Sequence, residues 1–470
     1  MVRFAEPLVV AVSSCSIAVS AIQLQVPRIP FPSVPTNAEP AWRSLDDLPG
    51  ADETSRTKLE RRTKSRLRTR VEDLITSSGK LKAHQRVAGA LAASFEAEDF
   101  NPVPWFSNNH FQTICGYLAR DIPESSYIKN GNIMPFVGAA VGSFLRRNNR
   151  AKCNFWDERE EVRTPDGDWF HADYKAAEGS PKGLVILLHG LEANAESALS
   201  RGIASAYEDL GMDVVCLNFR GCSGEPNDTL GGYHAGFTGD LKYCLELLKS
   251  EFAELPPIYL SGFSLGGNVV LKALGELGLD AVKRYNIKGA AVACPPFDLE
   301  RDIRFLNKQG FNRAVYANGL LEKFKDKVQD QLETLCNGDE STHRFNFHDT
   351  MAASTTQEFD NAFIAPVYGF RDAAEYYEKC SSMFFLEKIA VPTLVIRAKD
   401  DPFFDPEAIP QYLTYEEGGR APVKIVETAH GGHLGYAFQQ LDDEAAKPNR
   451  SWLPYQLARF LQHVQEDSNQ

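Results

Sequence analysis

The chain has 470 residues, of which 43% are hydrophobic, and it carries a formal net charge of −13 at pH 7. Its length suits one large domain with extensions or two domains, and its composition is that of a soluble globular protein with a sizeable core. Such an acidic chain is a poor candidate for binding nucleic acid, because that function calls for a basic face. The nine cysteines form no C-x-x-C pair and show no metal-ligand spacing to histidines, so neither a zinc site nor a disulfide framework is predicted.

Residues 1–26 form a segment of a different kind. One arginine precedes an apolar run from Pro7 to Val26, and residues 19–21 read Val-Ser-Ala. Small residues behind an apolar run are typical of a leader cleaved by signal peptidase, yet the run is also nearly long enough to span a bilayer. Three interpretations stay open: a signal or plastid-type leader, an uncleaved membrane anchor, and a plain apolar tail. Either of the first two would direct the protein to a membrane of the endomembrane system or a plastid.

Residues 27–100 are predicted to be an N-terminal extension. Residues 27–56 are rich in proline and charge, which is typical of a linker. Residues 57–75 place a thin apolar stripe on a strongly basic background. This pattern fits a solvated helix better than a helix that lies on an anionic membrane surface, although the second interpretation stays open.

From residue 101 to residue 465 the sequence pattern is that of a globular domain. Short apolar runs alternate with helical patterns, and continuous apolar runs are typical of parallel strands that are covered on both faces. The alternation predicts an α/β fold with a mostly parallel, twisted sheet flanked by helices. The expected strands are residues 183–189, 212–219, 257–263, 288–294, 391–398 and 422–428.

The alternation stops between residues 297 and 388. This stretch is helical in pattern and contains the long amphipathic run 320–335. We therefore expect a helical cap inserted at 297–388 over the edge of the sheet.

One short motif stands where an expected strand becomes an expected helix. Gly262, Ser264 and Gly266 form a G-x-S-x-G pattern, and a strand-to-helix turn is the setting that a nucleophile elbow requires. The turn strains the serine backbone, and the small neighbours remove side-chain clashes. Ser264 is therefore the candidate nucleophile, against the alternative of a glycine-rich turn without chemistry.

A serine nucleophile needs a histidine base that is oriented by a carboxylate, in the chain order Ser, acid, His for this architecture. The strand 391–398 is followed by Asp400 and Asp401, and the strand 422–428 by His430 and His433. Asp401 precedes a proline at the loop tip, and His433 follows two glycines that allow the loop to swing inward. We prefer Asp401 and His433, and expect Asp400 and His430 to have structural roles.

The oxyanion of a tetrahedral intermediate needs backbone N–H donors. Leu265 follows the candidate nucleophile directly, and Leu191 lies in the loop after the strand 183–189; these two N–H groups are the candidate oxyanion hole. His189 precedes the serine in the chain, so a structural role in shaping this loop is expected rather than catalysis.

Several collinear motifs between residues 100 and 440 carry a family resemblance. The chain resembles the α/β-hydrolases and, within them, the YheT-like, embryogenesis-associated branch, which includes medium-chain ester synthases/esterases and membrane-anchored phospholipases. This resemblance implies an α/β-hydrolase fold with Ser264, Asp401 and His433 as its triad. The motifs are residues 108–114, 187–193, 218–227, 233–241, 262–276, 359–377, 400–404 and 430–436.

Three hypotheses for function follow. The first is a serine hydrolase that cleaves carboxylic esters of lipid-like acyl chains, a carboxylesterase or acylglycerol lipase with a small-molecule substrate. The second transfers the same acyl group to an alcohol instead of water. The third is a non-catalytic binding scaffold, which an intact set of three catalytic groups disfavours. Nothing in the sequence implies a metal or an organic cofactor, and the oligomeric state is left open.

Overall fold

The computed structural model describes residues 79–102, 107–119, 155–308, 310–336, 344–416, 418–437 and 451–468. The expectations for residues 1–26, for the linker and for the basic stretch 57–75 fall outside these residues. No helix within the described ranges is long and apolar enough to cross a membrane.

The compact unit that contains the sheet begins at residue 81, earlier than the expected start at residue 101. A helix that ends at residue 93 is tied into this unit by Gln85, whose amide donates hydrogen bonds to the carbonyls of Glu387 and Ile389 at 2.6 and 2.9 Å. The ring of Phe95 packs edge-on against Phe460, with centroids 5.2 Å apart. These buried contacts make residues 81–100 part of the domain core.

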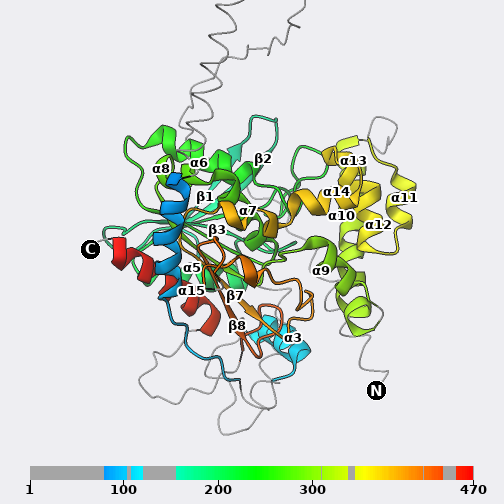
Figure 1. Cartoon of the computed structure of the whole chain (residues 1–470). Coiled ribbons are helices and arrows are strands. Elements are labelled where there is room, and N and C mark those ends of the chain that lie inside the picture. The colour runs from blue at the N-terminus through cyan, green and yellow to red at the C-terminus, as the bar shows by residue number, and fades with distance from the viewer. Residues whose placement is uncertain are drawn as a thin grey trace, which may run out of the picture. The chain divides into compact units, whose positions relative to one another are not determined.

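An eight-stranded sheet forms the centre of this unit, in the order β1-β2-β4-β3-β5-β6-β7-β8 (Figure 1). The first two strands pair antiparallel with their neighbours, and the other pairs are parallel. The α/β fold with a mostly parallel sheet is therefore confirmed. The strands are β1 (Glu158–Arg163), β2 (Trp169–Lys175), β3 (Leu184–Leu188), β4 (Asp213–Leu217), β5 (Ile258–Phe263), β6 (Ile287–Ala293), β7 (Thr393–Ala398) and β8 (Val423–Thr428).

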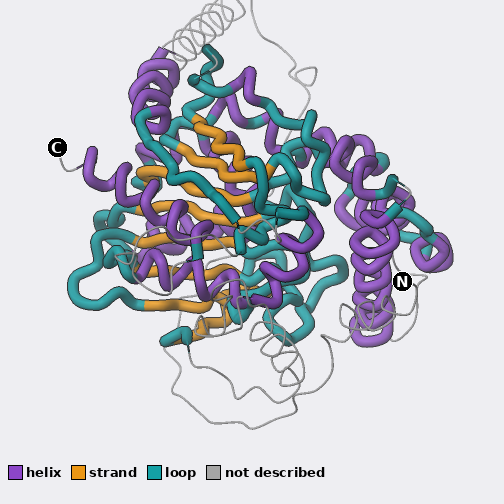
Figure 2. Tube along the Cα trace, turned by 90° about the horizontal axis from the view of Figure 1, so that it is seen from below, coloured by secondary structure: helices purple, strands orange, loops and turns teal. Residues whose placement is uncertain are grey.

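Helices cover both faces of the sheet, as Figure 2 shows around the orange strands. Ile186 and Leu188 of β3 belong to one buried cluster, while Val185 and Leu187 belong to the cluster on the opposite face. Because successive side chains of a strand point to opposite faces, β3, which is covered on both faces, is apolar at every position. The first face carries α6 (Gly239–Glu251), α7 (Leu265–Leu277) and α8 (Leu279–Lys283), and the second carries α5 (Ala198–Glu208) and α15 (Trp452–Ser468).

The expected cap contains two kinds of packing. Its first part forms a separate helical lobe beside the sheet, yellow in Figure 1, with its own small core around Leu321, Val328 and Phe363. The last part packs into the main core instead, through Tyr377 and Leu386, which are buried. The lobe comprises α10 (Asn318–Cys336), α11 (Phe347–Ala352), α12 (Thr356–Phe359), the π-helix η7 (Asp360–Ile364) and α13 (Ala365–Tyr368). It is preceded by α9 (Leu299–Leu306), whose Leu299 belongs to the main core, and by the π-helix η5 (Asn312–Ala317). The last part comprises α14 (Ala373–Cys380), η8 (Ser382–Phe384) and η9 (Leu386–Lys388).

Candidate active site

Ser264 stands in a sharp turn between β5 and α7. Its backbone has φ 52° and ψ −126°, a conformation that is strained for a residue with a side chain. Backbone hydrogen bonds hold Ser264 in this conformation. The Ser264 N–H donates to the carbonyl of Ala293 at 2.8 Å, and the Ser264 carbonyl accepts from the N–H of Gly267 at 3.0 Å. The turn therefore presents the hydroxyl at the carboxyl end of the central strand, above the start of a helix.

The glycines on either side of Ser264 are required by close backbone approach. A Cβ at Gly262 would lie 2.6 Å from the carbonyl oxygen of Gly266. A Cβ at Gly266 would run into the carbonyl oxygens of Leu188 and His189. Larger residues at either position would force the turn open, which explains the small residues of the G-x-S-x-G pattern.

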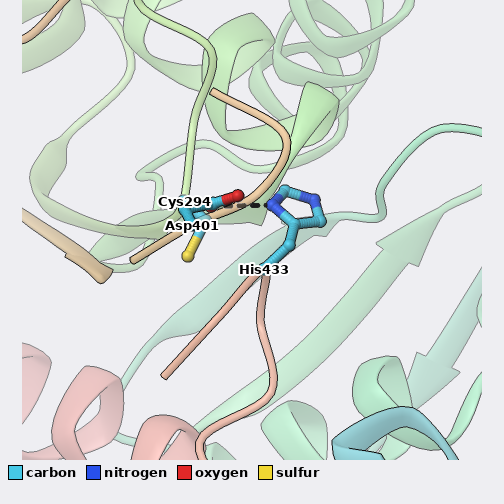
Figure 3. Close-up of side chains that lie close together, drawn as sticks. All are labelled: Cys294, Asp401 and His433. Atoms are coloured by element: carbon cyan, nitrogen blue, oxygen red, sulfur yellow. Dashed lines mark hydrogen bonds and ion pairs between the residues drawn. The ribbon is translucent and has the colours of Figure 1, made fainter. Parts of the chain in front are cut away.

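The structure brings Ser264, His433 and Asp401 together from three separate loops. Ser264 Oγ lies 3.0 Å from His433 Nε2, and His433 Nδ1 lies 2.9 Å from Asp401 Oδ2, the contact drawn in Figure 3. The Asp401 side chain is 1% exposed and that of His433 is 10% exposed. The second Asp401 oxygen accepts the N–H of Phe403 at 2.8 Å. This arrangement places the proton on Nδ1 and leaves Nε2 as an acceptor for the serine hydroxyl.

Asp400 and His430 lie beside this group without joining it. Asp400 Oδ1 accepts the N–H of Gly432 at 2.9 Å, so its carboxylate braces the loop that carries His433. His430 Nδ1 is 3.5 Å from the other Asp400 oxygen, and its side chain is 44% exposed. Burial raises the pKa of Asp400, and the N–H of Gly432 acts against that rise. Asp400 thus bonds to the backbone of the loop that carries His433, and His430 only approaches Asp400.

The candidate oxyanion donors flank Ser264. Leu265 is the first residue of α7, and a Cβ at Gly190, the residue before Leu191, would lie 3.2 Å from Ser264 Cβ. Within the described part of the chain, neither leucine donates its N–H to another backbone carbonyl. Both residues therefore remain the candidates for the oxyanion hole, Leu265 by its place directly after Ser264 and Leu191 by the close approach of Gly190 to Ser264.

His189 is fully buried beneath this loop. Its Nε2 accepts the N–H of Phe219 at 3.0 Å, and its Nδ1 lies 2.8 Å from the carbonyl of Gly190, to which it donates. Burial lowers the pKa of His189 to about 4, so the ring is neutral at pH 7. The imidazole thus links the segment after β3 to the segment after β4.

The loop after β3 also touches the helical lobe, a contact that the sequence analysis did not find. Glu192 has φ 51°, its N–H donates to the Tyr233 hydroxyl at 3.0 Å, and that hydroxyl donates to the Glu192 carboxylate at 2.6 Å. Lys327 Nζ of α10 lies 3.2 Å from the same carboxylate. Lys327 stands in an ordinary amphipathic helix pattern, which gives no signal for a partner so far away in the chain.

Aromatic side chains surround the candidate base. The ring of Phe403 stacks on His433 with centroids 4.3 Å apart, and Phe404 meets it edge-on at 4.9 Å. Tyr316 of η5 packs on Phe403 at 4.7 Å, and Phe311 packs at 6.0 Å from Tyr316. We call Phe403, Phe404, Tyr316 and Phe311 the aromatic wall. Phe403 and Phe404 follow Asp401 closely in the sequence, and this apolar pair is the signal that could have predicted the wall.

Cys294, Asp401 and His433 have potential ligand atoms within 4.8 Å of one another (Figure 3). Burial, followed by the negative charge of Asp401, raises the pKa of the Cys294 thiol to about 12. A metal ligand must be a thiolate, and a protonated thiol is a poor ligand. Asp401 and His433 are also bonded to each other, so the donor set does not fit a metal ion and is better explained as an acid–base pair over a buried thiol.

The sequence profile of the alpha/beta hydrolase fold matches residues 183–438, more than half of the chain. This chain belongs to the α/β-hydrolase family. The α/β-hydrolase match begins at β3 and extends beyond the loop that carries His433. It thus spans all three residues of the Ser264–His433–Asp401 group.

Relatives place this α/β-hydrolase in the YheT-like branch. It is 33% identical to the esterase candidate YheT of Escherichia coli over 303 residues, which covers 64% of this chain and 85% of that protein. It is 28% identical over 302 residues to monoacylglycerol lipase of Saccharomyces cerevisiae, covering 62% of this chain and 61% of the lipase. It is 29% identical over 299 residues to medium-chain fatty acid ethyl ester synthase/esterase 2 of the same yeast, covering 60% of this chain and 62% of the relative.

Proposed function

We propose that the protein is a serine hydrolase that cleaves carboxylic esters of lipid-like acyl chains through an acyl-enzyme on Ser264. The observation that carries this proposal is the hydrogen-bonded series from Ser264 Oγ to His433 Nε2 and from His433 Nδ1 to Asp401 Oδ2, at 3.0 and 2.9 Å. A strained serine with a histidine base and a buried carboxylate is the arrangement that activates a hydroxyl for acyl transfer.

The proposed reaction has two halves. His433 takes the proton of Ser264 as its Oγ attacks the ester carbonyl, and the N–H groups of Leu191 and Leu265 receive the negative charge that develops on the carbonyl oxygen. His433 then protonates the departing alcohol, which leaves an acyl group on Ser264. A water molecule, deprotonated by His433, then attacks that acyl group, and His433 returns the proton to Ser264 Oγ as the bond to the acyl group breaks, which releases the acid and restores the free serine. Asp401 keeps the imidazole oriented and stabilises its positive charge throughout.

Two observations support an apolar acyl chain. The wall beside His433 is built from Phe403, Phe404 and Tyr316, and it continues to Phe311, which is 47% exposed. Burial of each methylene of an acyl chain against such a wall is worth up to about 0.8 kcal/mol. The relatives are named for a monoacylglycerol and for medium-chain fatty acid esters, which are substrates of this kind.

Transfer of the acyl group to an alcohol is the second candidate function. It is favoured by the likeness to an ethyl ester synthase/esterase, because synthesis and hydrolysis share the acyl-enzyme and differ only in the acceptor. The relative's name joins both activities, and the two reactions can therefore be compared in one assay.

Product analysis tests both candidates. The protein is incubated with p-nitrophenyl esters of graded acyl length, with and without ethanol, and the free acid and the ethyl ester are quantified. Hydrolysis predicts free acid as the main product even when ethanol is present, whereas an acyltransferase would form mainly ethyl ester. Absence of any Ser264-dependent product across the whole series would contradict both.

We further propose that the N-terminal segment brings the enzyme to a membrane, as a leader or as an anchor. The support is the apolar run from Pro7 to Val26 and the basic stretch 57–75, because apolar area and positive charge together attract a chain to anionic lipid.

A further inference from the structure

Helix α3 (Asn109–Ala119) packs directly against the loop that carries His433. We name residues 430–437 the histidine loop; the cyan helix α3 lies near β8, the strand that this loop follows (Figure 1). A Cβ at Gly432 would lie 2.5 Å from the carbonyl oxygen of Asn109, and a Cβ at Gly116 would lie 2.6 Å from Gly435 Cα. Helix and loop therefore touch backbone to backbone, which only glycines at these positions allow.

Two side chains of α3 bond to the backbone of the histidine loop, one at His433 and one at Ala437. The N–H of His433 donates to Thr113 Oγ1 at 2.9 Å, and that hydroxyl donates to the carbonyl of Asn109 at 2.8 Å. Gln112 is fully buried; its Nε2 donates to the carbonyl of Ala437 at 3.0 Å, and its Oε1 accepts the N–H of the same residue at 2.9 Å. The histidine loop is thus bonded to α3 at His433, the candidate catalytic base, and again four residues later at Ala437.

The histidine loop needs such external contacts because its backbone is strained. Leu434 and Tyr436 have φ values of 61° and 45°, and Gly432 has φ 56°. Left-handed conformations of residues with side chains cost of order 1–3 kcal/mol each and persist only when the surroundings over-determine them. On the other side of the loop, the carboxylate of Asp400 holds the N–H of Gly432 at 2.9 Å. Helix α3 supplies the opposing contacts.

We propose that Thr113 and Gln112 are positioning residues that hold the His433 imidazole between Ser264 and Asp401, so that α3 is part of the catalytic apparatus although it touches no reacting atom. This inference rests on the proposed serine hydrolase activity. Its physical basis is that proton transfer depends steeply on geometry, and a misplacement of about 1 Å can cost about a hundredfold in rate.

The test compares Thr113→Val with Thr113→Ser. Valine has the shape of threonine but cannot accept the His433 N–H, whereas serine keeps the hydroxyl. Thr350→Val is the matched control, because Thr350 Oγ1 also donates to a carbonyl four residues earlier, at 2.8 Å, but it lies on α11 in the helical lobe. We expect Thr113→Val to lower kcat on a short soluble ester about 10- to 100-fold with KM changed less than about twofold. Thr113→Ser and Thr350→Val should stay within about threefold of the wild type.

A second arm separates positioning from general stability. If Thr113 acts through the imidazole, Thr113→Val should cause no further loss of activity in a His433→Ala background. A further loss in that background equal to the loss in the wild type, or an unchanged kcat in Thr113→Val alone, would overturn the inference. Gln112→Met, which keeps the approximate length of the side chain but cannot bond to Ala437, provides the same test if the Thr113 variant does not fold, and is expected to lower kcat about 10-fold.

Ser264→Ala is measured alongside these variants. If it retains activity, the proposed function fails, whatever the Thr113 variants do. If it is inactive while Thr113→Val is fully active, only the role of α3 fails. The two failures are therefore distinguishable in one set of assays.

Discussion

At the scale of single residues, neighbouring residues of the same type have different contacts in the site. Asp401 bonds to His433, whereas Asp400, one position earlier, turns its carboxylate to the backbone of the histidine loop. The sequence favours Asp401 because the proline after it marks a loop tip, and favours His433 because two glycines precede it. No sequence pattern could show that the His433 N–H needs Thr113, since that contact joins segments 320 residues apart.

The two histidines should differ sharply in their effect on activity. His433→Ala should lower esterase activity nearly as far as loss of Ser264. The reason is that the serine and its base act together, so removing either one removes most of their joint effect on the rate. His430→Ala should keep most of the activity, since its side chain is 44% exposed and only approaches Asp400. Initial rates on a soluble ester measure both, and the reverse order would show that the base has been assigned to the wrong histidine.

The neighbouring acids give a second comparison. Asp401→Asn keeps the shape of the side chain but favours the wrong imidazole tautomer, so kcat should drop by about four orders of magnitude. Asp400→Asn can still accept the Gly432 N–H and should cost far less. Steady-state kinetics measure kcat of the two variants. A large loss of kcat in Asp400→Asn, together with an active Asp401→Asn, would contradict the assignment of Asp401 as the acid that orients His433.

At the scale of elements, the parallel strands were predictable and two other strands were not. The six expected apolar runs correspond to β3 through β8, because strands buried on both faces leave a continuous apolar signature. β1 is exposed along most of its length and reads Glu-Arg-Glu-Glu-Val-Arg, so it carries no such signature. Its place depends on antiparallel pairing with β2, which a local pattern does not encode. The π-helices η5 and η7 likewise arise from packing within the helical lobe.

The helical lobe should influence the oxyanion loop through Lys327. Its ammonium group pairs with Glu192 at 3.2 Å, and both side chains are 21% exposed, so the pair is worth no more than about 1 kcal/mol. Lys327→Met should therefore lower kcat about two- to fivefold. The effect should disappear when Glu192→Gln is already present, as a double-mutant cycle would measure.

Lys325→Met is the control for this cycle, because Lys325 lies on the same helix and its ion pair among the described residues, 3.7 Å to Glu322, stays within that helix. Fully additive effects of Lys327→Met and Glu192→Gln, or an equal loss in the Lys325 variant, would show that the lobe and the oxyanion loop are not coupled through this pair.

At the scale of the whole molecule, the expected division of the chain differs from the packing in two places. Residues 81–100 belong to the compact unit, because their contacts to Ile389 and Phe460 are made by buried groups far apart in sequence. The end of the expected cap packs with the main core through Tyr377 and Leu386. Both differences come from tertiary contacts, which a helical periodicity alone cannot assign to one lobe or another.

Membrane delivery is tested by comparing the full chain with a protein that begins at Gly79, the first residue that the structure describes. Both should act equally on a short soluble ester, because the shortened protein keeps the whole compact unit. The shortened protein should act more slowly on lipid vesicles, since it lacks the apolar and basic segments. Equal rates on vesicles would remove the delivery role.

The same assays address the acyl chain. If the aromatic wall beside His433 binds the substrate, kcat/KM should rise with each added methylene by up to about fourfold, the equivalent of about 0.8 kcal/mol, and then fall when the binding surface is filled. A flat profile across acyl lengths would contradict an apolar acyl site.

The central claim is that Ser264 forms a covalent acyl-enzyme, and active-site labelling measures this most directly. The full-length protein is treated with a fluorophosphonate probe, and the modified peptide is identified by mass spectrometry in the wild type and in Ser264→Ala. We expect one probe per chain on Ser264 in the wild type, and neither labelling nor ester hydrolysis in the alanine variant. Labelling of the alanine variant at the wild-type level, with hydrolysis retained, would contradict this claim.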